Sequence, residues 1–283
     1  LQWCSKLVEP VAGGTLGLSA VAGDASFRRY YRLAGCEPTR IAVFAPPDKE
    51  RNLEFTRIAA MLREAGVCAP EVLAHDSANG FLLLSDFGDT LMLGGLDEGS
   101  VDGLYARAMD TLLLIQGAAT GREGWQLPAY SGALLRQEME LFPEWYLEGL
   151  LGIELEARDE ALLQDLFARL VASAREQPQV FVHRDYHSRN LMRTDATGAG
   201  NPGIIDFQDA VFGPISYDMV SLLKDAYIEW DEELALDWLV RYWEAARKAG
   251  LLVPGDFGKF FRDYEWMGVQ RHIKVLGIFA RLY

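Results

Sequence analysis

The chain changes character near residue 88, and this change limits the folds that it can adopt. Before this point, apolar residues recur in short runs that turn residues separate, and one longer stretch has apolar residues at helical spacing. A period of two indicates strands, whereas a period of 3.6 indicates a helix. We expect a small antiparallel sheet with one helix, from strands at 14–22, 27–33, 40–45, 71–75 and 81–85 and a helix at 51–65.

After Gly88 the sequence contains long amphipathic segments. Asp231 precedes one of them and Gly250 follows it, in agreement with the residue preferences of helix ends. Helices are expected at 98–118, 131–150, 155–176, 216–229, 231–249 and 256–281, and short strands at 179–183, 190–194 and 203–206. The prediction is an α+β fold with two lobes, a small sheet lobe in residues 1–88 and a larger, mostly helical lobe in residues 89–283.

The composition argues against several classes of protein. The 283 residues carry 27 Lys and Arg against 41 Asp and Glu, and the net charge of −14 repels the phosphates of nucleic acids. No apolar run approaches the roughly 18 residues of a membrane span. The three cysteines, Cys4, Cys36 and Cys68, form no CxxC pair and no zinc spacing, which indicates reduced thiols. We expect a cytoplasmic monomer without a nucleic-acid or membrane partner.

Three oxygen-bearing side chains follow apolar runs in the second half of the chain. His183-Arg184-Asp185 ends one predicted strand, Asn190 comes five residues after Asp185, and Asp206 ends another strand. The ends of two strands can bring such side chains together. Phosphoryl transfer from a nucleotide requires a carboxylate that accepts a hydroxyl proton and oxygen ligands for Mg²⁺.

The alternative for this segment is a polar turn in which Asp185 and Asn190 hydrogen-bond the local backbone. A single His-x-Asp would favour that alternative. The spacing HxDxxxxN, the predicted strands on both sides and the isoleucines before Asp206 favour the catalytic interpretation.

His183-Arg184-Asp185 to Asn190, together with Ile205-Asp206-Phe207, resembles the catalytic and metal motifs of the protein-kinase superfamily, and specifically its aminoglycoside phosphotransferase branch. This resemblance implies a bilobal kinase-like fold that uses ATP and Mg²⁺. It implies that Asp185 is the catalytic base, that Asn190 and Asp206 are the Mg²⁺ ligands, and that His183 and Asp218 hold the loop.

Further segments are similar to bacterial anomeric sugar kinases, which phosphorylate N-acetylmuramate and N-acetylglucosamine at carbon 1 in cell-wall recycling. This similarity implies transfer from ATP to the anomeric hydroxyl, giving the sugar 1-phosphate for peptidoglycan recycling. The segments are Gly23–Arg32, Ala45–Pro47, Phe81–Asp89, Gln270–Lys274 and Gly277–Phe279.

Nucleotide contacts are expected in the first lobe. The segment 23–32 occupies the place of the glycine-rich loop of kinases, although it holds one glycine where kinases have three. Backbone amides at the tip of such a loop bind phosphates, and a strand that ends at the lobe change offers its backbone to adenine. The expected contacts are Ser26, Phe27 and Arg28 for the phosphates and Ser85 and Phe87 for adenine.

The chain departs from the kinase pattern at the predicted strand 40–45, which contains no lysine. Kinases pair a lysine at this strand with a glutamate of the following helix. Glu54 is expected as the acidic partner, and Arg40, Arg28 and Lys49 remain open as the source of the cation.

The last 18 residues, 266–283, contain four basic side chains and no acidic one. One interpretation is a solvated basic face, and the other is a wall of the substrate site that meets an anionic group. Two of these side chains lie three positions apart, on one face of a helix. The substrate-binding candidates are these two, Arg271 and Lys274, together with Gln208 and Asp209, which follow the metal motif.

Two other functions remain open. The first is a kinase of another small alcohol, such as an aminoglycoside or a choline-like amine, which the acidity of the chain would suit. Acidic residues near Asp185 would favour such a cationic substrate, whereas cations near it would favour an anionic sugar. The second is a nucleotide-binding pseudokinase without turnover, although such a protein has little reason to keep Asp185, Asn190 and Asp206 together.

Overall fold

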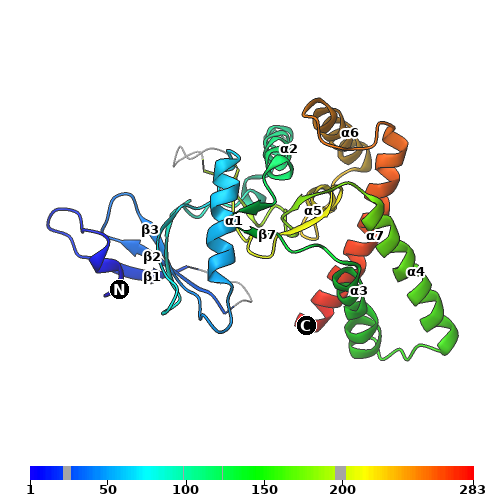
Figure 1. Cartoon of the computed structure of the whole chain (residues 1–283), viewed down its shortest axis with the longest axis horizontal. Helices are drawn as coiled ribbons and strands as arrows, with labels where there is room; N and C mark the ends of the chain where they lie inside the picture. The colour runs from blue at the N-terminus through cyan, green and yellow to red at the C-terminus, as the bar shows by residue number, and fades with distance from the viewer. Residues whose placement is uncertain (22–26, 98, 123, 195–201) are drawn as a thin grey trace. The chain divides into compact units, whose positions relative to one another are not determined.

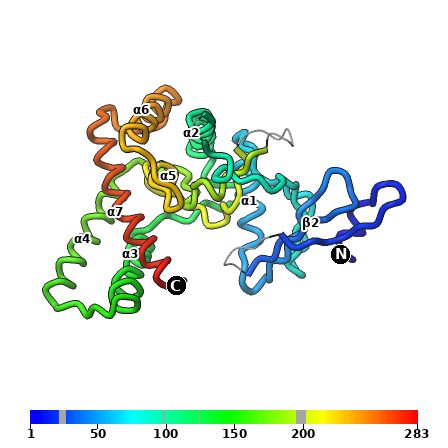
Figure 2. Tube along the Cα trace, turned by 180° about the vertical axis from the view of Figure 1, so that it is seen from behind, coloured from blue at the N-terminus to red at the C-terminus, as the bar shows by residue number. Residues whose placement is uncertain are grey.

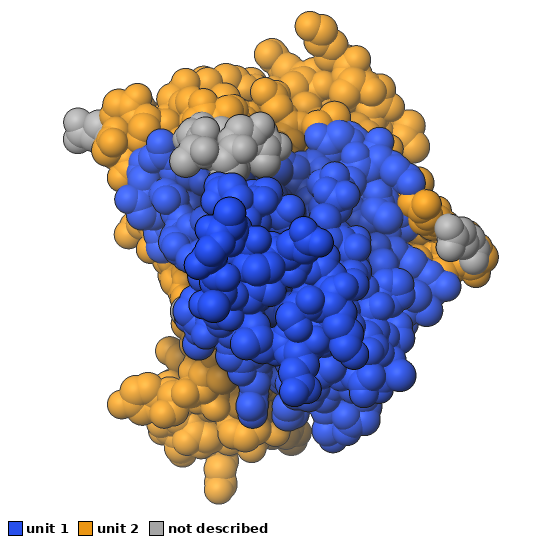
Figure 3. Space-filling view, turned by 90° about the vertical axis from the view of Figure 1, so that its left-hand side faces the viewer, with its two compact units in different colours: residues 1–95, 191–208 blue, residues 96–190, 209–283 orange. Residues whose placement is uncertain are grey.

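The computed structural model describes residues 1–21, 27–97, 99–122, 124–194 and 202–283 (Figure 1). The chain divides into two units, which are coloured separately in Figure 3. Unit 1 contains residues 1–95 and 191–208, and unit 2 contains residues 96–190 and 209–283. This division differs from the expected single boundary at residue 88, because a segment of the second half belongs to unit 1.

Unit 1 contains a five-stranded antiparallel sheet in the order β1-β2-β3-β5-β4. The register pairs Arg29 with Phe44 and Arg40 with Ser85. The expected strands are confirmed to within three residues at each end. Their bounds are β1 (Gly17–Ala20), β2 (Arg29–Ala34), β3 (Arg40–Phe44), β4 (Val72–Asp76) and β5 (Phe81–Ser85).

Helix α1 (Asn52–Glu64), labelled in Figure 1, lies between β3 and β4 in the chain. It packs against β4. It buries Phe55, Ile58 and Leu62, whose spacing of three and four residues puts them on one face. Gly66 follows the helix with a φ of +84°, a conformation that favours glycine after a helix end. A second core cluster of unit 1 includes Leu33, Ala42, Leu83 and two of the cysteines, and all three cysteines of the chain are free thiols.

Residues 191–208 complete unit 1. They contribute the antiparallel pair β9 (Leu191–Met192) and β10 (Gly203–Ile204). The N–H of Ile204 donates to the carbonyl of Cys68 at 2.8 Å. The ring of Phe207 stacks on Phe55 of α1, with 4.9 Å between the ring centroids. These contacts attach the expected metal motif, which follows β10, to the helix of unit 1.

Unit 2 is mostly helical, and α7 is its central helix. It packs against α3, α4, α5, α6 and the π-helical segment η3, and Figures 1 and 2 both show it beside α3 and α4. The helices are α2 (Val101–Gly117), α3 (Gly132–Leu141), η3 (Phe142–Leu150), α4 (Ala157–Glu176), α5 (Tyr217–Leu223), α6 (Glu232–Lys248) and α7 (Phe257–Leu282).

The position of α7 depends on one close approach. A Cβ atom at Gly277 would lie 2.5 Å from the carbonyl carbon of Leu141, at the junction of α3 and η3. Only a glycine allows this separation, because real Cβ atoms do not approach other atoms so closely.

Parts of unit 2 differ from the sequence prediction, among them the short antiparallel pair β6 (Gly121–Arg122) and β7 (Trp125–Gln126), which was not expected. Strand β11 (Val211–Pro214), which pairs with β8 (Gln179–Val182), was not expected, because Gly213 and Pro214 conceal its strand pattern. Helix α5 ends at Leu223 rather than 229, since Lys224 leaves the helical conformation with φ −113° and ψ 47°.

Among the described residues, none of the helices combines the length and the apolar character needed to cross a bilayer.

Candidate active site

Asp218 anchors the start of the loop 183–190. Its carboxylate, in the first turn of α5, accepts hydrogen bonds from the N–H of His183 at 2.7 Å and from the N–H of Arg184 at 3.0 Å. Burial raises the pKa of Asp218 to about 7, and the charge of Asp185 adds to this effect while the two backbone hydrogen bonds oppose it. The loop that carries Asp185 is therefore attached to α5 directly after β8.

Two residues of the expected site have strained backbones. Arg184 has a φ of +77° and Asp206 a φ of +65°, and they are the only non-glycine residues with positive φ in the described part of the chain. Side chains other than glycine rarely adopt this region, and such strain concentrates at functional sites. The two outliers therefore point to the same two segments as the sequence motifs.

Glu138 of α3 neutralises two cations, one in the loop 183–190 and one in α7. It forms ion pairs with Arg184 and, at 3.1 Å, with Lys274 of α7, and it accepts a hydrogen bond from the hydroxyl of Tyr130. Burial by itself raises the pKa of Glu138, but Lys274, Arg184 and Tyr130 outweigh it and hold the pKa below its usual value. Glu138 thus stays ionised and fixes the side chain of Arg184, next to Asp185.

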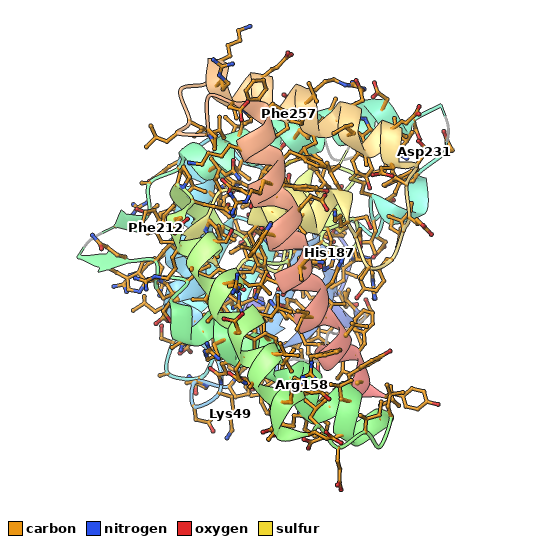
Figure 4. All side chains as sticks on the ribbon, turned by 90° about the vertical axis from the view of Figure 1, so that its right-hand side faces the viewer. Lys49, Arg158, His187, Phe212, Asp231 and Phe257 are labelled. Atoms are coloured by element: carbon orange, nitrogen blue, oxygen red, sulfur yellow. The ribbon has the colours of Figure 1, made fainter. Side chains whose placement is uncertain are left out.

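Asp185 lies in a field of positive charge. Burial raises its pKa, yet Lys274, His187, Arg184 and Arg271 together lower it below the usual value for an aspartate. His187, labelled next to α7 in Figure 4, has a pKa that burial lowers, and its Nδ1 has no hydrogen-bond partner among the described residues. Asp185 is therefore a carboxylate at neutral pH and can accept a proton.

The remainder of the loop is closed by hydrogen bonds within unit 2. The Asn190 Nδ2 atom donates to the carbonyl of Asp185 at 3.0 Å, and the N–H of Asp185 donates to Nδ1 of His183 at 3.3 Å. Asp225 accepts hydrogen bonds from the N–H of Ser188 at 3.0 Å and from its hydroxyl at 2.6 Å. The side chain of Asn190 is thus oriented through its nitrogen, and its oxygen Oδ1 is the atom whose chemistry suits a metal.

Asp206 belongs to unit 1 and is described there. The Gln208 Nε2 atom donates to its Oδ1 at 2.5 Å, and Oε1 of Gln208 is buried without a hydrogen-bond partner among the described residues. Asp209, at the start of a segment of unit 2, offers its carbonyl to Nη1 of Arg184 at 3.2 Å. Of the two substrate candidates after the metal motif, Gln208 therefore contacts Asp206, and Asp209 contacts Arg184 of the loop.

The expected nucleotide contacts of unit 1 have different environments. Phe27 is 63% exposed, and its N–H donates to Glu50 at 3.1 Å. The N–H of Ser85 donates to the carbonyl of Glu71 at 3.0 Å, so this N–H is already used. Phe87 is buried, and none of the described residues hydrogen-bonds its backbone. Glu54 is partly buried in the first turn of α1, and Ser26 lies outside the described residues.

The segment after β5 is held by Arg32, a role that the sequence did not indicate. Its Nε donates to Asp86 at 2.6 Å and its Nη1 to Asp89 at 2.7 Å, while the hydroxyl of Thr39 donates to Asp86 at 2.9 Å. These carboxylates raise the pKa of Arg32 above its usual value. Arg32 therefore fixes the end of β5 to β2.

The two basic candidates of α7 are both buried but differ in their partners. Lys274 pairs with Glu138 and donates to the hydroxyl of Tyr217 at 3.1 Å. Arg271 is 3% exposed, its Nη1 is buried without a hydrogen-bond partner, and it forms no ion pair within the described residues. A solvated basic face is excluded for both residues, because neither is exposed.

The sequence did not identify Glu138, Glu50 or Asp225 as members of the site. An acidic residue in an amphipathic helix is usually solvated, so the presence of a glutamate at position 138 did not predict a buried site residue. A usable signal was its position, since it lies three residues after Leu135 and one before Met139, both fully buried.

A sheet unit, a helical unit and a strained loop with an ionised aspartate agree with the expected kinase-like phosphotransferase. The sequence matches the phosphotransferase enzyme family (APH) over residues 17–251, and the chain belongs to that family.

Curated relatives are similar over nearly the whole chain. The N-acetylmuramate/N-acetylglucosamine kinase of Pseudomonas aeruginosa is 46% identical over 94% of this chain and 76% of the relative. The kinase of the same name from Neisseria meningitidis is 45% identical over 94% of this chain and 78% of the relative.

Solved structures support the fold. An ethanolamine kinase from Plasmodium vivax superposes with a TM-score of 0.67 and 12% identity, covering 96% of this chain and 78% of that one. An aminoglycoside-3'-phosphotransferase of type VIII gives a TM-score of 0.60 and 15% identity, covering 91% of this chain and 93% of that one. The expected kinase-like α+β fold is therefore confirmed.

Proposed function

We propose that this protein is a kinase that transfers the γ-phosphoryl group of ATP to the anomeric hydroxyl of N-acetylmuramate and N-acetylglucosamine, giving the sugar 1-phosphates. The observation that carries the proposal is the identity of 44 to 46%, over 94% of this chain, with three relatives named for these two sugars. Such an enzyme would act as a cytoplasmic monomer in the recycling of peptidoglycan sugars, a setting that suits its free thiols.

Asp185 is proposed as the base that orients and deprotonates the sugar hydroxyl. Its lowered pKa keeps it ionised at neutral pH, and the hydrogen bonds of the loop hold its backbone. A base acts mainly in the transition state, because only there does the hydroxyl become acidic enough to give up its proton. His183 and Asp218 would position this base through the loop, without contact with the sugar.

Asn190 and Asp206 are proposed to hold Mg²⁺ through their side-chain oxygens. Mg²⁺ at nucleotide sites takes one or two protein carboxylates together with phosphate oxygens and water, not a complete protein cage. The amide oxygen of Asn190 and the carboxylate of Asp206 agree with this pattern. When bound, the ion would neutralise charge on the phosphates.

The nucleotide is proposed to bind unit 1. Ser26, Phe27 and Arg28 would contact the phosphates, with Glu54 near them, and the carbonyl of Ser85 and the backbone of Phe87 would contact adenine. The hydrogen bonds of Arg32 support the adenine contacts, because they fix the segment after β5.

The sugar is proposed to contact Gln208, Asp209, Arg271 and Lys274. The charges around Asp185 support an anionic sugar over a choline-like cation, since Lys274, Arg184 and Arg271 all lower its pKa. The unpaired polar atoms of His187 and Arg271 are also suited to a polar ligand such as a sugar.

A substrate panel tests the proposal. The release of ADP from ATP is measured with N-acetylmuramate, N-acetylglucosamine, glucose, choline and kanamycin, each with and without Mg²⁺. The two N-acetyl sugars should stimulate release only with Mg²⁺, and phosphorus NMR should show a phosphate coupled to the anomeric proton. If only choline or kanamycin stimulated ADP release, the substrate would be another alcohol and not an N-acetyl sugar. If no compound stimulated ADP release, the protein would be a nucleotide-binding pseudokinase.

A further inference from the structure

Strand β3 cannot supply the phosphate-binding cation that kinases place there. Its only charged residue is Arg40, and Nη1 of this side chain donates to the carbonyls of Pro38 at 2.7 Å and Thr39 at 3.1 Å. These acceptors precede the strand, and Arg40 itself pairs with Ser85 at the end of β5. Arg40 is therefore turned back toward the β2–β3 connection.

Lys49 and Arg29 are also poor sources of this cation because they are solvated. The side chain of Lys49 is 53% exposed, and its nearest carboxylate oxygen belongs to Asp48 at 3.9 Å. Arg29 is exposed at the first position of β2. A charge in water contributes little to binding, since solvent screens it.

Arg28 has the opposite environment. It is 4% exposed, and its Nη2 lies 3.1 Å from Oε2 of Glu50, whose side chain is 12% exposed. The other oxygen of Glu50 accepts a hydrogen bond from the N–H of Phe27 at 3.1 Å. Glu50 therefore holds both the backbone before β2 and the guanidinium of Arg28.

Two sets of interactions within unit 1 connect Arg28 with Asp206 or its neighbour. The guanidinium lies over the ring of Phe55, 5.4 Å from its centroid, and Phe55 stacks on Phe207, the neighbour of Asp206. Tyr30 interacts with both residues: burial and the charges of Asp206 and Glu50 raise its pKa to about 12, and Arg28 opposes this shift. Arg28 and Asp206 thus act on the same buried hydroxyl.

A buried ion pair contributes little to stability, because the loss of hydration offsets the attraction between the charges. A guanidinium carries a fixed positive charge and binds phosphate oxygens in a bidentate manner. We propose that Arg28, held by Glu50, is the cation that binds the nucleotide phosphates in this chain and replaces the missing lysine of the third strand. This inference depends on the proposed function in one respect, namely that the nucleotide is ATP.

Calorimetric titration with MgADP and with adenosine, in the absence of sugar, tests this role of Arg28. Arg28→Met should weaken MgADP binding by roughly 10- to 100-fold and leave adenosine binding within about twofold, because only the phosphates lose a contact. Arg29→Met and Lys49→Met are matched controls that remove exposed cations nearby, and both should bind MgADP as the parent does. Because no sugar is present, the result does not depend on which alcohol the enzyme phosphorylates.

Two further variants separate phosphate binding from folding. Arg28→Met leaves the carboxylate of Glu50 unpaired, so the double variant Arg28→Met/Glu50→Gln removes this charge as well and should still bind MgADP weakly. Arg28→Lys keeps the positive charge but loses the bidentate geometry of the guanidinium, so its affinity for MgADP should be intermediate. The proposal is overturned if these variants bind MgADP as tightly as the parent, or if they lose adenosine and MgADP equally.

Discussion

At the scale of single residues, the first prediction concerns Asp185, the proposed catalytic base. Asp185→Asn should lower kcat by about 10²- to 10⁴-fold and leave MgADP affinity unchanged, because a base contributes mainly in the transition state. Steady-state kinetics with both sugars and calorimetry with MgADP measure the two effects. A kcat within about threefold of the parent would contradict the assignment of the base.

Arg271 and Lys274 should contribute differently, although the sequence suggested one shared role. Arg271 has no ion-pair partner among the described residues, so it is free to meet the lactyl carboxylate of N-acetylmuramate. Arg271→Met should raise the KM for N-acetylmuramate by roughly 10- to 100-fold, in line with about 1.5 to 3 kcal/mol for a hydrogen bond to a charged group. N-acetylglucosamine, which lacks that carboxylate, should be much less affected.

Lys274 is already paired with Glu138 and lowers the pKa of Asp185, so Lys274→Met should lower kcat with both sugars. Kinetics with each sugar as the varied substrate separate the two variants. If Arg271→Met raised the KM for both sugars equally, its guanidinium would bind the phosphoryl group or stabilise the fold and would not recognise the lactyl carboxylate.

At the scale of secondary structure, the contact of α7 with the end of α3 depends on Gly277. Gly277→Ala should lower the free energy of unfolding by about 1 to 3 kcal/mol, because its Cβ would overlap the backbone of Leu141. Gly268→Ala on the same helix is the matched control. Its Cβ would meet only the flexible side chain of Lys224 at 3.4 Å, and alanine favours the helix. Urea unfolding compares the two, and equal stabilities would contradict the close approach.

Glu138 connects α3, the loop and α7, and this connection should depend on pH. Because its pKa is lowered from 4.5, the carboxylate stabilises the fold fully above about pH 4.5, and this contribution is lost as the pH falls through the folded-state value. Glu138→Gln should therefore cost about 3 kcal/mol at pH 5 to 8, as expected for breaking a buried pair, and less at pH 3.5.

Denaturant unfolding over this pH range measures the cost. Glu140→Gln, two residues further along α3, removes an exposed carboxylate and should have almost no effect at any pH. A cost that does not change with pH would mean that the charge of Glu138 is not what stabilises the fold.

The sequence predicted most elements of secondary structure, because periodicity, helix ends and turn residues are local properties. It failed where a distant partner decides the conformation. Strand β11 exists because β8 pairs with it, and α5 ends early where Asp225 turns to hold Ser188. The π-helical segment η3 likewise lies against α7, far away in the sequence.

At the scale of the whole molecule, the chain leaves unit 1 after residue 95 and returns to it for residues 191–208. A fragment of residues 1–95 should therefore not unfold cooperatively by circular dichroism, because it lacks Ile204 and Phe207, both fully buried. Residues 191–208 joined to it through a Gly/Ser linker should restore a cooperative transition. A cooperative transition of the fragment alone would show that the returning segment is dispensable for folding.

The sequence alone predicted the kinase-like fold, through its resemblance to a known family, and it contains the motifs of Asp185, Asn190 and Asp206 and no lysine in the third strand, because motifs depend on the order and spacing of residues along the chain. Only the tertiary structure decided which cations are buried and which partners they have. Arg28 is paired with Glu50, Lys274 with Glu138, and Arg271 with none of the described carboxylates. The environment of a charge depends on residues that folding brings together, and no local pattern in the sequence records it.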